Sequence, residues 1–235
     1  MAIKLPDPVG SMLGTNGLES GAVTNFFGGP GTGKTNLCLL AVMECVRNKG
    51  KVVYIDTEGG FSAERIQQIC RGNDIDSESA VKNIEIVEPK TFEEQRKCIQ
   101  QLQEKEADLI IVDSIVSLYR LGNDPEKGRQ SREELLEANR ELSRQLSILS
   151  NMARQRKIPV IVTAHTFKNW ETGENEMIGG DVLKYWSKAI IFLERTDKLS
   201  ERKATITKHR FMEEGKEAKF VIVEKGIEPS KFKIF

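Results

Sequence analysis

One stretch of the sequence constrains the possible folds more than any other, the run Gly-Gly-Pro-Gly-Thr-Gly-Lys-Thr at residues 28–35. An apolar run, Val23–Phe27, precedes it, and a pattern with the period of an amphipathic helix follows it. Glycines at this spacing let backbone amides approach an anion closely, and the following helix adds the positive pole of its dipole. The stretch therefore predicts a strand, a phosphate-binding loop and a helix, which together open an α/β fold.

Every residue of this loop has an expected role in holding a nucleotide. Lys34 would neutralise charge on the β- and γ-phosphates, and the hydroxyl of Thr35 would ligate magnesium. The other loop residues supply backbone amides and allow close approach; they are Gly28, Gly29, Pro30, Gly31, Thr32 and Gly33. We therefore expect ATP and Mg²⁺ as cofactors.

The rest of the chain alternates between short apolar runs and longer helical patterns, which is typical of a mostly parallel central sheet flanked by helices. The expected strands of this sheet are Val23–Phe27, Val52–Ile55, Ile84–Val87, Leu109–Val112 and Val160–Ala164. Further strands with short turns are expected at Ala189–Leu193, Lys203–Phe211 and Ala218–Val223, the last two as an antiparallel hairpin. Residues 1–21 are expected to be a short irregular lead-in, and residues 22–235 a single domain.

Two helices have clear signals in the sequence. Thr91 followed by Glu94 is a capping box, which predicts a helix from Phe92 to about residue 106. The longest helical pattern covers residues 132–156 and carries an apolar stripe that we expect in the core. The members of this stripe are Leu135, Leu142, Leu146, Leu149 and Ala153.

Composition limits the classes of function. The chain has 35 acidic and 35 basic side chains, so overall charge gives no argument for a nucleic-acid partner. Four scattered cysteines, without a Cys-x-x-Cys pair, argue against a zinc site or a disulfide framework and favour a reducing compartment. No run approaches the roughly 18 apolar residues of a membrane span. We therefore expect a cytoplasmic protein with no membrane partner.

Two carboxylates follow expected strands on the same edge of the sheet. The continuous apolar run Leu109–Val112 ends in Asp113, a place from which a carboxylate can hold magnesium through a water; a helix-capping aspartate is the alternative. Glu58 follows the strand Val52–Ile55 and is the candidate base that orients and activates an attacking water. A solvated loop glutamate is the alternative for Glu58.

Several segments together resemble the RecA/RadA recombinase family. Beside the phosphate loop, they are Tyr-Ile-Asp-Thr-Glu-Gly-Gly-Phe-Ser-Ala-Glu-Arg at 54–65, Ile-Val-Asp-Ser at 111–114, Leu-Tyr-Arg at 118–120, Ile-Gly-Gly-Asp at 178–181, Lys-His-Arg-Phe at 208–211 and Glu-Lys-Gly-Ile-Glu at 224–228. The resemblance covers nearly the whole chain and is closest for a short archaeal paralogue of RadA. It implies a RecA-type P-loop ATPase core, weak ATP hydrolysis, DNA binding, and an accessory role in homologous recombination and DNA repair without strand exchange.

The resemblance also assigns roles residue by residue. Glu58 matches the family's catalytic glutamate, and Arg65 matches an arginine that stacks on adenine, although a helix-surface arginine is the alternative. Lys208 and Arg210 are expected on one strand face and resemble a Lys-x-Arg pair of the related KaiC proteins, which reaches the γ-phosphate across a subunit interface. A solvated strand face is the alternative for that pair.

Residues 121–132 and 167–180 fall where the family has its two DNA-contacting loops. The candidate DNA-binding residues in them are Lys127, Arg129, Arg132, Lys168 and Trp170. They would offer phosphate contacts beside an aromatic platform for unpaired bases. Charged loops are also often simply solvated, and Trp170 can instead pack against a neighbouring loop.

The sequence departs from the family pattern in three places. We find no helix-hairpin-helix domain before the ATPase core and no Phe-x-x-Ala segment in residues 1–21. In addition, Thr163-Ala164-His165 stands where strand-exchange recombinases place a glutamine that couples nucleotide state to the second DNA loop. These departures argue against filament formation and strand exchange.

The expected partners are single-stranded or branched DNA and, from the family, RadA, a Holliday-junction resolvase and the replicative polymerase, with a homo-oligomer as a further expectation. The competing function is a KaiC-like signalling ATPase that does not bind DNA. Asp56-Thr57-Glu58-Gly59, where KaiC would have a Glu-Glu pair, favours the recombinase branch. A module that binds ATP only as a structural ligand is a third alternative.

Overall fold

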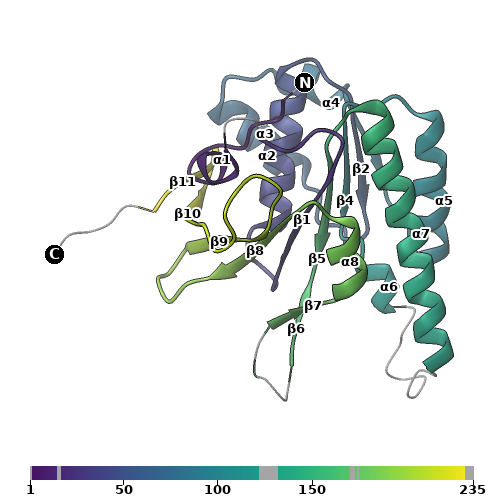
Figure 1. The fold of residues 1–235 in the computed structure, drawn as a ribbon. Coiled ribbons are helices and arrows are strands. Elements are labelled where there is room, and N and C mark those ends of the chain that lie inside the picture. The colour runs from purple at the N-terminus through teal and green to yellow at the C-terminus, as the bar shows by residue number, and fades with distance from the viewer. Residues whose placement is uncertain (1, 15–16, 122–131, 170–172, 174, 231–235) are drawn as a thin grey trace.

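The computed structural model describes residues 2–14, 17–121, 132–169, 173 and 175–230. Within these residues the central sheet has nine strands in the order β11-β10-β9-β8-β1-β5-β4-β2-β3 (Figure 1). They are β1 (Val23–Gly28), β2 (Val52–Asp56), β3 (Ile84–Val87), β4 (Leu109–Asp113), β5 (Val160–Ala164), β8 (Ala189–Arg195), β9 (Glu201–Lys208), β10 (Glu217–Val223) and β11 (Gly226–Pro229). A separate antiparallel pair, β6 (Thr166–Lys168) and β7 (Asn175–Met177), follows β5.

The sheet is parallel on one side of β8 and antiparallel on the other. All neighbouring strands from β8 to β3 are parallel, and those from β8 to β11 are antiparallel. Strands β1, β2, β4 and β5 are buried along their whole length, which explains their continuous apolar runs. The predicted α/β class, the five parallel strands and the antiparallel C-terminal strands are confirmed.

Helices cover both faces of the sheet (Figure 1). On one face lie α2 (Lys34–Arg47), α3 (Ala63–Gly72) and α4 (Ser77–Val81), whose buried residues share a cluster with Phe26 and Ile161. On the other face lie α5 (Phe92–Gln101), α6 (Ser117–Leu121), α7 (Arg132–Arg156) and α8 (Gly180–Trp186). A single 3₁₀ turn, Leu102–Glu104, extends α5. The two helices with clear sequence signals are therefore present.

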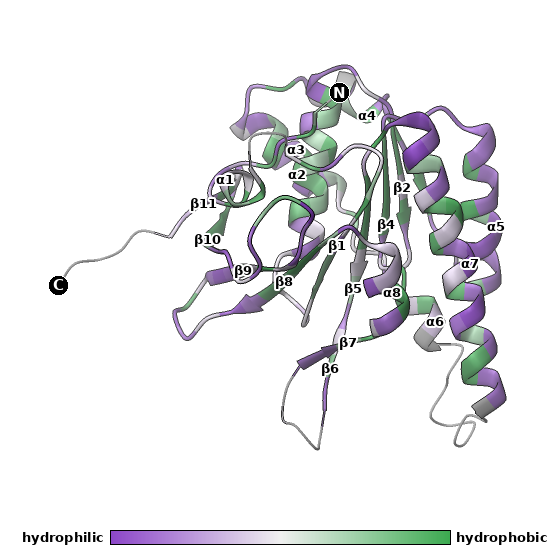
Figure 2. Ribbon diagram, viewed as in Figure 1, coloured by the Kyte–Doolittle hydropathy of each residue, from purple (hydrophilic) through white to green (hydrophobic). Residues whose placement is uncertain are grey.

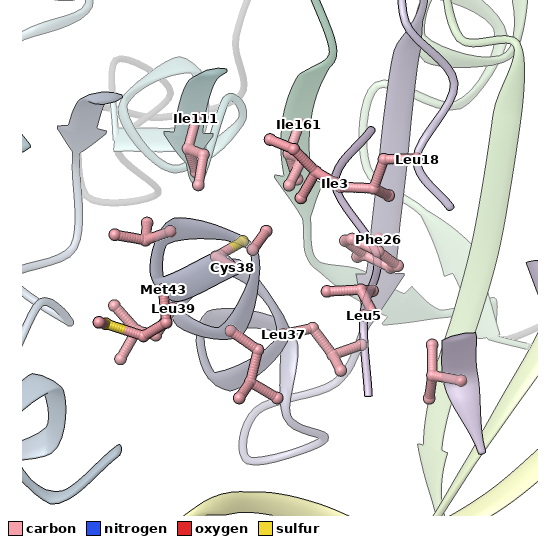
Figure 3. Close-up of a cluster of buried hydrophobic side chains, with 14 of the residues drawn as sticks. Ile3, Leu5, Leu18, Phe26, Leu37, Cys38, Leu39, Met43, Ile111 and Ile161 are labelled. Carbon is pink, nitrogen blue, oxygen red and sulfur yellow. The ribbon is translucent and has the colours of Figure 1, made fainter. Parts of the chain in front are cut away.

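The packing of α2 fixes the phosphate loop against the sheet. Figure 3 shows Cys38 on the side of α2 that faces Ile111 of β4 and Ile161 of β5. Cys38 and Cys45 are free and buried in this packing. Because α2 begins directly after the loop, its burial sets the direction in which the loop amides point.

The segment before β1 packs into the core, although the sequence predicted only a short irregular lead-in there. Ile3 forms an antiparallel bridge with Leu18, and the short helix α1 (Val9–Leu13) lies between them. Ile3, Leu5 and Leu18 are almost fully buried, and Figure 3 shows them beside Phe26 of β1. The apolar residues of this segment are therefore part of the core.

Two local predictions are wrong. Strand β9 ends at Lys208, so Arg210 does not lie on the strand and does not share a strand face with Lys208. Leu135 leaves 42% of its surface exposed, whereas the other four residues of the α7 stripe are completely buried. Leu135 lies in the first turn of α7, before the helix reaches the sheet, and this explains its exposure.

Hydropathy follows the layers of the fold. Figure 2 shows apolar strands enclosed between helices that turn their hydrophilic sides outward, while β6 and β7 extend beyond the helical layer as a largely hydrophilic pair. None of the helices in the described ranges is long and apolar enough to cross a bilayer.

Candidate active site

The carboxyl ends of four parallel strands bring the phosphate loop, Glu58 and Asp113 to one edge of the sheet. In the register, Asp56 of β2 lies opposite Asp113 of β4, and Phe27 of β1 lies opposite Ala164 of β5. The phosphate loop follows Phe27, Glu58 lies two residues after Asp56, and His165 follows Ala164, so all of them lie beside Asp113 at this edge. Ligands of open α/β sheets bind at this kind of edge.

The conformation of the phosphate loop requires several of its glycines. Gly31 has φ +67° and Gly33 has φ +102°, a region that other residues adopt only with strain. At Gly28 a Cβ atom would lie 2.1 Å from the carbonyl oxygen of Leu193 on the neighbouring strand β8. The hydroxyl of Thr32 donates to the Gly29 carbonyl at 2.9 Å, which closes the turn.

Lys34 lies inside the loop rather than in solvent. Its Nζ atom donates to the carbonyl oxygens of Gly28 at 2.9 Å and Gly29 at 3.0 Å. Burial lowers the pKa of Lys34, and the nearby carboxylates of Glu58 and Asp113 partly oppose that shift. A lysine held here by carbonyl oxygens can exchange these contacts for stronger ones to phosphate oxygens.

Asp113 is almost completely buried at the tip of β4. Tyr54 donates its hydroxyl to Oδ2 at 2.7 Å, and Thr163 donates its hydroxyl to Oδ1 at 2.5 Å. Burial raises the pKa of Asp113, and hydrogen bonds from Thr163, Tyr54 and Thr35 partly oppose that shift. The carboxylate is therefore fixed beside Thr35, the other predicted magnesium ligand.

The loop that carries Glu58 is held by Asp56. The two carboxylate oxygens of Asp56 accept four consecutive backbone amides, those of Glu58, Gly59, Gly60 and Phe61, at 2.8–3.2 Å. Thr57 bridges to the next strand, because its hydroxyl donates to the Ser114 carbonyl at 2.7 Å and accepts from the Ser114 amide at 2.9 Å. The segment after β2 and the segment after β4 are thus fixed to each other.

The Glu58 carboxylate points into the same edge and is one-third exposed. Its Oε1 atom accepts a hydrogen bond from the Ser117 hydroxyl and contacts Nε2 of His165. Burial raises the pKa of Glu58, but the contacts with His165 and Ser117 outweigh burial, and the pKa lies below its ordinary value. The Glu58 carboxylate is therefore held by Ser117 and His165, the charge of Lys34 also lowers its pKa, and its catalytic role stays a prediction.

The donor set at this edge fits magnesium-bound ATP. Loop amides and Lys34 suit phosphate oxygens, and the Thr35 hydroxyl and Asp113 are the hard oxygen ligands that magnesium prefers. Within the described residues, no group of three His, Cys, Asp or Glu side chains could hold a metal alone. A magnesium ion here would take its remaining ligands from phosphate oxygens and water, which is how this ion usually binds.

Arg65 lies beside the loop but is held by several partners. Its guanidinium donates to Oδ1 of Asn36 at 2.7 Å and to the carbonyl oxygens of Val223 at 2.7 Å and Glu224 at 3.0 Å. These contacts connect α3 to α2 and to the turn after β10. They hold the guanidinium in place beside α2, and the stacking role of Arg65 stays a prediction.

Lys208 and Arg210 lie away from the phosphate loop of their own chain. Lys208 pairs with Ile190, which pairs with Asn25, three residues before Gly28. At about 3.3 Å per residue, this places Lys208 roughly 10 Å back along the sheet. The Nζ atom of Lys208 donates to the Lys184 carbonyl at 2.5 Å, and Arg210 forms an ion pair with Glu19 at 2.7 Å. The register therefore places Lys208 away from the phosphate loop of its own chain, and the roles of Lys208 and Arg210 stay predictions.

Only part of the predicted DNA-binding set can be placed. Lys168 lies exposed at the end of β6. Lys127, Arg129 and Trp170 lie outside the described residues, and Arg132 begins α7, but its side chain is likewise outside them. The DNA-binding assignments therefore stay predictions.

Several residues of the site had no assigned role in the sequence analysis. Tyr54 and Thr163 hold Asp113, and Asp56 holds the loop of Glu58. An aspartate followed at once by Thr-Glu-Gly-Gly is a signal for such an amide-binding turn, because glycines give the backbone the freedom to bring successive amides to one carboxylate. Ser117 and His165 carry no local signal, because each meets Glu58 only in the folded chain.

The sequence analysis also assigned no role to Arg195 and Arg202, two arginines that lie beside the phosphate loop. Arg202 of β9 donates Nε to the Gly31 carbonyl at 2.8 Å, and Arg195 lies directly opposite it on β8. A Cβ atom on Gly31 would lie 2.2 Å from the Arg195 guanidinium. Burial lowers the pKa of Arg202, and the neighbouring charge of Arg195 adds to that shift.

Known proteins share both the sequence and the fold of this chain. A family model described as Rad51 matches residues 8–230. The DNA repair and recombination protein RadB of Methanosphaera stadtmanae is 41% identical over 218 residues, covering 90% of this chain and 89% of that protein. The protein of the same description from Archaeoglobus fulgidus is 39% identical over 225 residues, covering 94% of this chain and 95% of that protein.

A solved structure agrees with these relatives. The crystal structure of the RadB recombinase superposes with a TM-score of 0.79 at 34% identity and covers 96% of this chain and 97% of that chain. The family model spans nearly the whole fold, from α1 to β11, and includes the phosphate loop, Glu58 and Asp113. The chain therefore belongs to the Rad51/RecA family.

Proposed function

We propose that this protein binds ATP and hydrolyses it slowly, binds DNA, and acts as an accessory protein in homologous recombination and DNA repair without strand exchange. The relatives described as RadB are DNA repair and recombination proteins, which supports the biological role. RadA, a Holliday-junction resolvase and the replicative polymerase are the protein partners that we expect, and the cytoplasm is the expected location.

The observation that carries the ATPase proposal is the meeting of three charged groups at one edge of the sheet. Lys34 lies inside the loop, Asp113 is fixed beside Thr35, and Glu58 lies close enough to both for its charge to act on their pKa values. A cation for phosphate, a ligand pair for magnesium and a carboxylate for water are the parts that γ-phosphate hydrolysis needs.

Each of these residues has one task in the proposed reaction. The loop amides and Lys34 bind the phosphates and offset their charge, and Thr35 and Asp113 hold the metal. Bound magnesium supplies neutralisation of charge on the phosphate oxygens. Glu58 orients a water for attack and accepts its proton, while the Asp56 turn keeps the Glu58 backbone in place.

Calorimetric titration with ATP and magnesium tests the binding part of this proposal. Lys34→Ala should abolish tight binding, because it removes the side-chain cation of the loop while the fold keeps its buried helix α2. Lys49→Ala, at the opposite end of α2, is the control and should bind like the wild type. Wild-type affinity in a Lys34→Ala protein with a native melting profile would contradict the phosphate-loop assignment.

The DNA-binding proposal is supported by the surface around the β6–β7 pair. A cleft of about 1280 Å³ lies between this pair, α6, α7, α8 and β9. Phe167, 45% exposed, lines it, and the exposed Lys168 follows directly. An exposed ring beside a cation suits stacking on unpaired bases with a phosphate contact, so we expect sequence-tolerant binding of single-stranded DNA.

Fluorescence polarisation with single-stranded DNA, with and without ATP and across a salt series, tests the second proposal. Replacing Lys127, Arg129 and Lys168 with Ala should weaken binding and flatten the salt dependence, since each lost phosphate contact lowers the slope by about 0.7. The matched control replaces Lys49, Lys82 and Lys157, which precede strands β2, β3 and β5 at the opposite edge. Wild-type affinity and slope in the first variant would show that these residues are not the DNA site.

A further inference from the structure

Glu58 is held by two side chains from elsewhere in the chain, and both contact the same carboxylate oxygen. The hydroxyl of Ser117 donates to Oε1, and Nε2 of His165 contacts Oε1 as well. A carboxylate oxygen has two lone-pair sites in its plane. With both contacts made, Oε1 has no site left for a water, and only Oε2 can accept one.

The two contacts come from different elements. Ser117 is the first residue of α6, and His165 lies between β5 and β6. Neither element is part of the phosphate loop or of the turn that Asp56 organises. Glu58 is therefore tied through its backbone to Asp56 and through its carboxylate to α6 and to the end of β5.

Such contacts weaken a carboxylate as a base. Hydrogen bonds to the charged form stabilise it and lower its pKa, and a general base is less effective as its pKa moves further below the working pH. Lys34 of α2 also faces Glu58 and lowers its pKa, while Asp113 of β4 and Asp56 of the same segment are the other charged groups nearby. Ser117 contributes a donor without a charge, which makes it the cleanest group to remove.

We propose that Ser117 and His165 are positioning residues that restrain the Glu58 carboxylate and thereby slow the hydrolysis of ATP. This inference rests on the proposed role of Glu58 as the base that activates water. It gives slow turnover a cause inside one chain, separate from any group that a second subunit would supply. Removal of either contact frees a lone pair of Oε1 and makes Glu58 a stronger base.

Steady-state ATP hydrolysis by the full chain, measured across a pH series, tests the restraint. Ser117→Ala should raise kcat by roughly two- to tenfold with an unchanged KM, because Ser117 lies outside the phosphate loop and outside the proposed magnesium ligands. The acid limb of the pH profile should move to higher pH, since Glu58 loses a contact that lowers its pKa. Ser117→Thr keeps a hydroxyl donor and should remain close to the wild type.

Variants of His165 test the same restraint a second time. His165→Ala should also raise kcat, and His165→Gln, which keeps an N–H donor, should raise it less. The variant that lacks both donors should exceed either single variant. An unchanged or lower kcat in Ser117→Ala, or an acid limb that does not move, would overturn the proposal.

A Glu58→Gln background separates this inference from the function on which it rests. If Glu58→Gln removes turnover and Ser117→Ala has no effect on the otherwise wild-type protein, the restraint is wrong while the role of Glu58 stands. If Glu58→Gln keeps wild-type turnover, Glu58 is not the base that activates water, and the restraint that rests on this role is wrong as well. In the proposed arrangement, Ser117→Ala adds nothing once Glu58 is Gln.

Discussion

Burial at the end of β4 disfavours the charged form of Asp113. The carboxylate lies almost completely buried at the tip of β4, and burial raises its pKa despite hydrogen bonds from Thr163 and Tyr54. A carboxyl whose pKa is higher in the folded chain than in the unfolded chain costs stability while it is charged. Without a bound metal ion, this candidate magnesium ligand therefore weakens the fold.

Because the charged form of Asp113 costs stability when no metal is bound, we predict how Asp113→Asn changes thermal stability in EDTA without nucleotide. Near neutral pH the variant should be more stable than the wild type, with its melting temperature raised by about 2–4 °C for each kcal/mol gained. The wild type recovers stability as pH falls through the folded pKa of Asp113, so the difference should shrink toward acid pH. Thermal unfolding followed by circular dichroism at several pH values checks both points, and a variant that is less stable at neutral pH would contradict them.

The site residues that could be predicted from sequence are those whose role follows from their own segment. The phosphate loop, Asp113 and Glu58 each follow a strand directly, so the edge they reach is set by the strand before them. Ser117 and His165 meet Glu58 across 59 and 107 residues of chain. No periodicity or spacing carries that information, because it depends on the order in which the strands pair.

At the scale of elements, buried parallel strands were the easiest to predict, and segments outside the repeating pattern the hardest. β3 and β5 have the predicted bounds. β5 is buried along its whole length and is largely apolar for that reason, whereas β3 is the partly exposed edge strand of the sheet. The end of β9 was missed, because residues 209–211 continue the strand pattern while Arg210 turns away to pair with Glu19. α1 was missed because it is a single short turn among Gly, Pro and Ser.

The bridge between Ile3 and Leu18 makes the N-terminal segment part of the folding unit. Leu18→Ala should lower the free energy of unfolding by about 2–5 kcal/mol, because it leaves a cavity in a packed cluster. Leu199→Ala is the control, since Leu199 is 97% exposed and should change stability by less than about 0.5 kcal/mol. Urea unfolding measures both, and equal stability of the two variants would mean that the segment packs only loosely.

At the scale of the whole molecule, the phosphate loop and the predicted trans-acting Lys208 lie apart. The phosphate loop lies at the carboxyl ends of the parallel strands, and Lys208 lies back along the sheet on β9. A cation so placed fits the prediction that it reaches a nucleotide on another copy, which would require a head-to-tail arrangement. Lys208 and Arg210 could be singled out from the sequence through a family resemblance, but the distance of Lys208 from the loop of its own chain follows only from the register of β8 and β9.

Hydrolysis per chain should therefore increase with protein concentration, because a group supplied in trans contributes about a thousandfold or more. Replacing both Lys208 and Arg210 with Ala should remove this increase and leave ATP affinity unchanged. Lys97→Ala, an exposed lysine on α5, is the control. Turnover that is fast and independent of concentration in dilute wild-type protein would rule out the contribution in trans.

The most direct test of the central claim is single-turnover hydrolysis of ATP by Glu58→Gln beside the wild type, with ATP binding measured on the same samples. Glutamine keeps the size of the side chain and removes its capacity to accept a proton. The account predicts that ATP still binds and that the hydrolysis rate falls by about 10²–10⁴-fold. Wild-type hydrolysis by Glu58→Gln would contradict it.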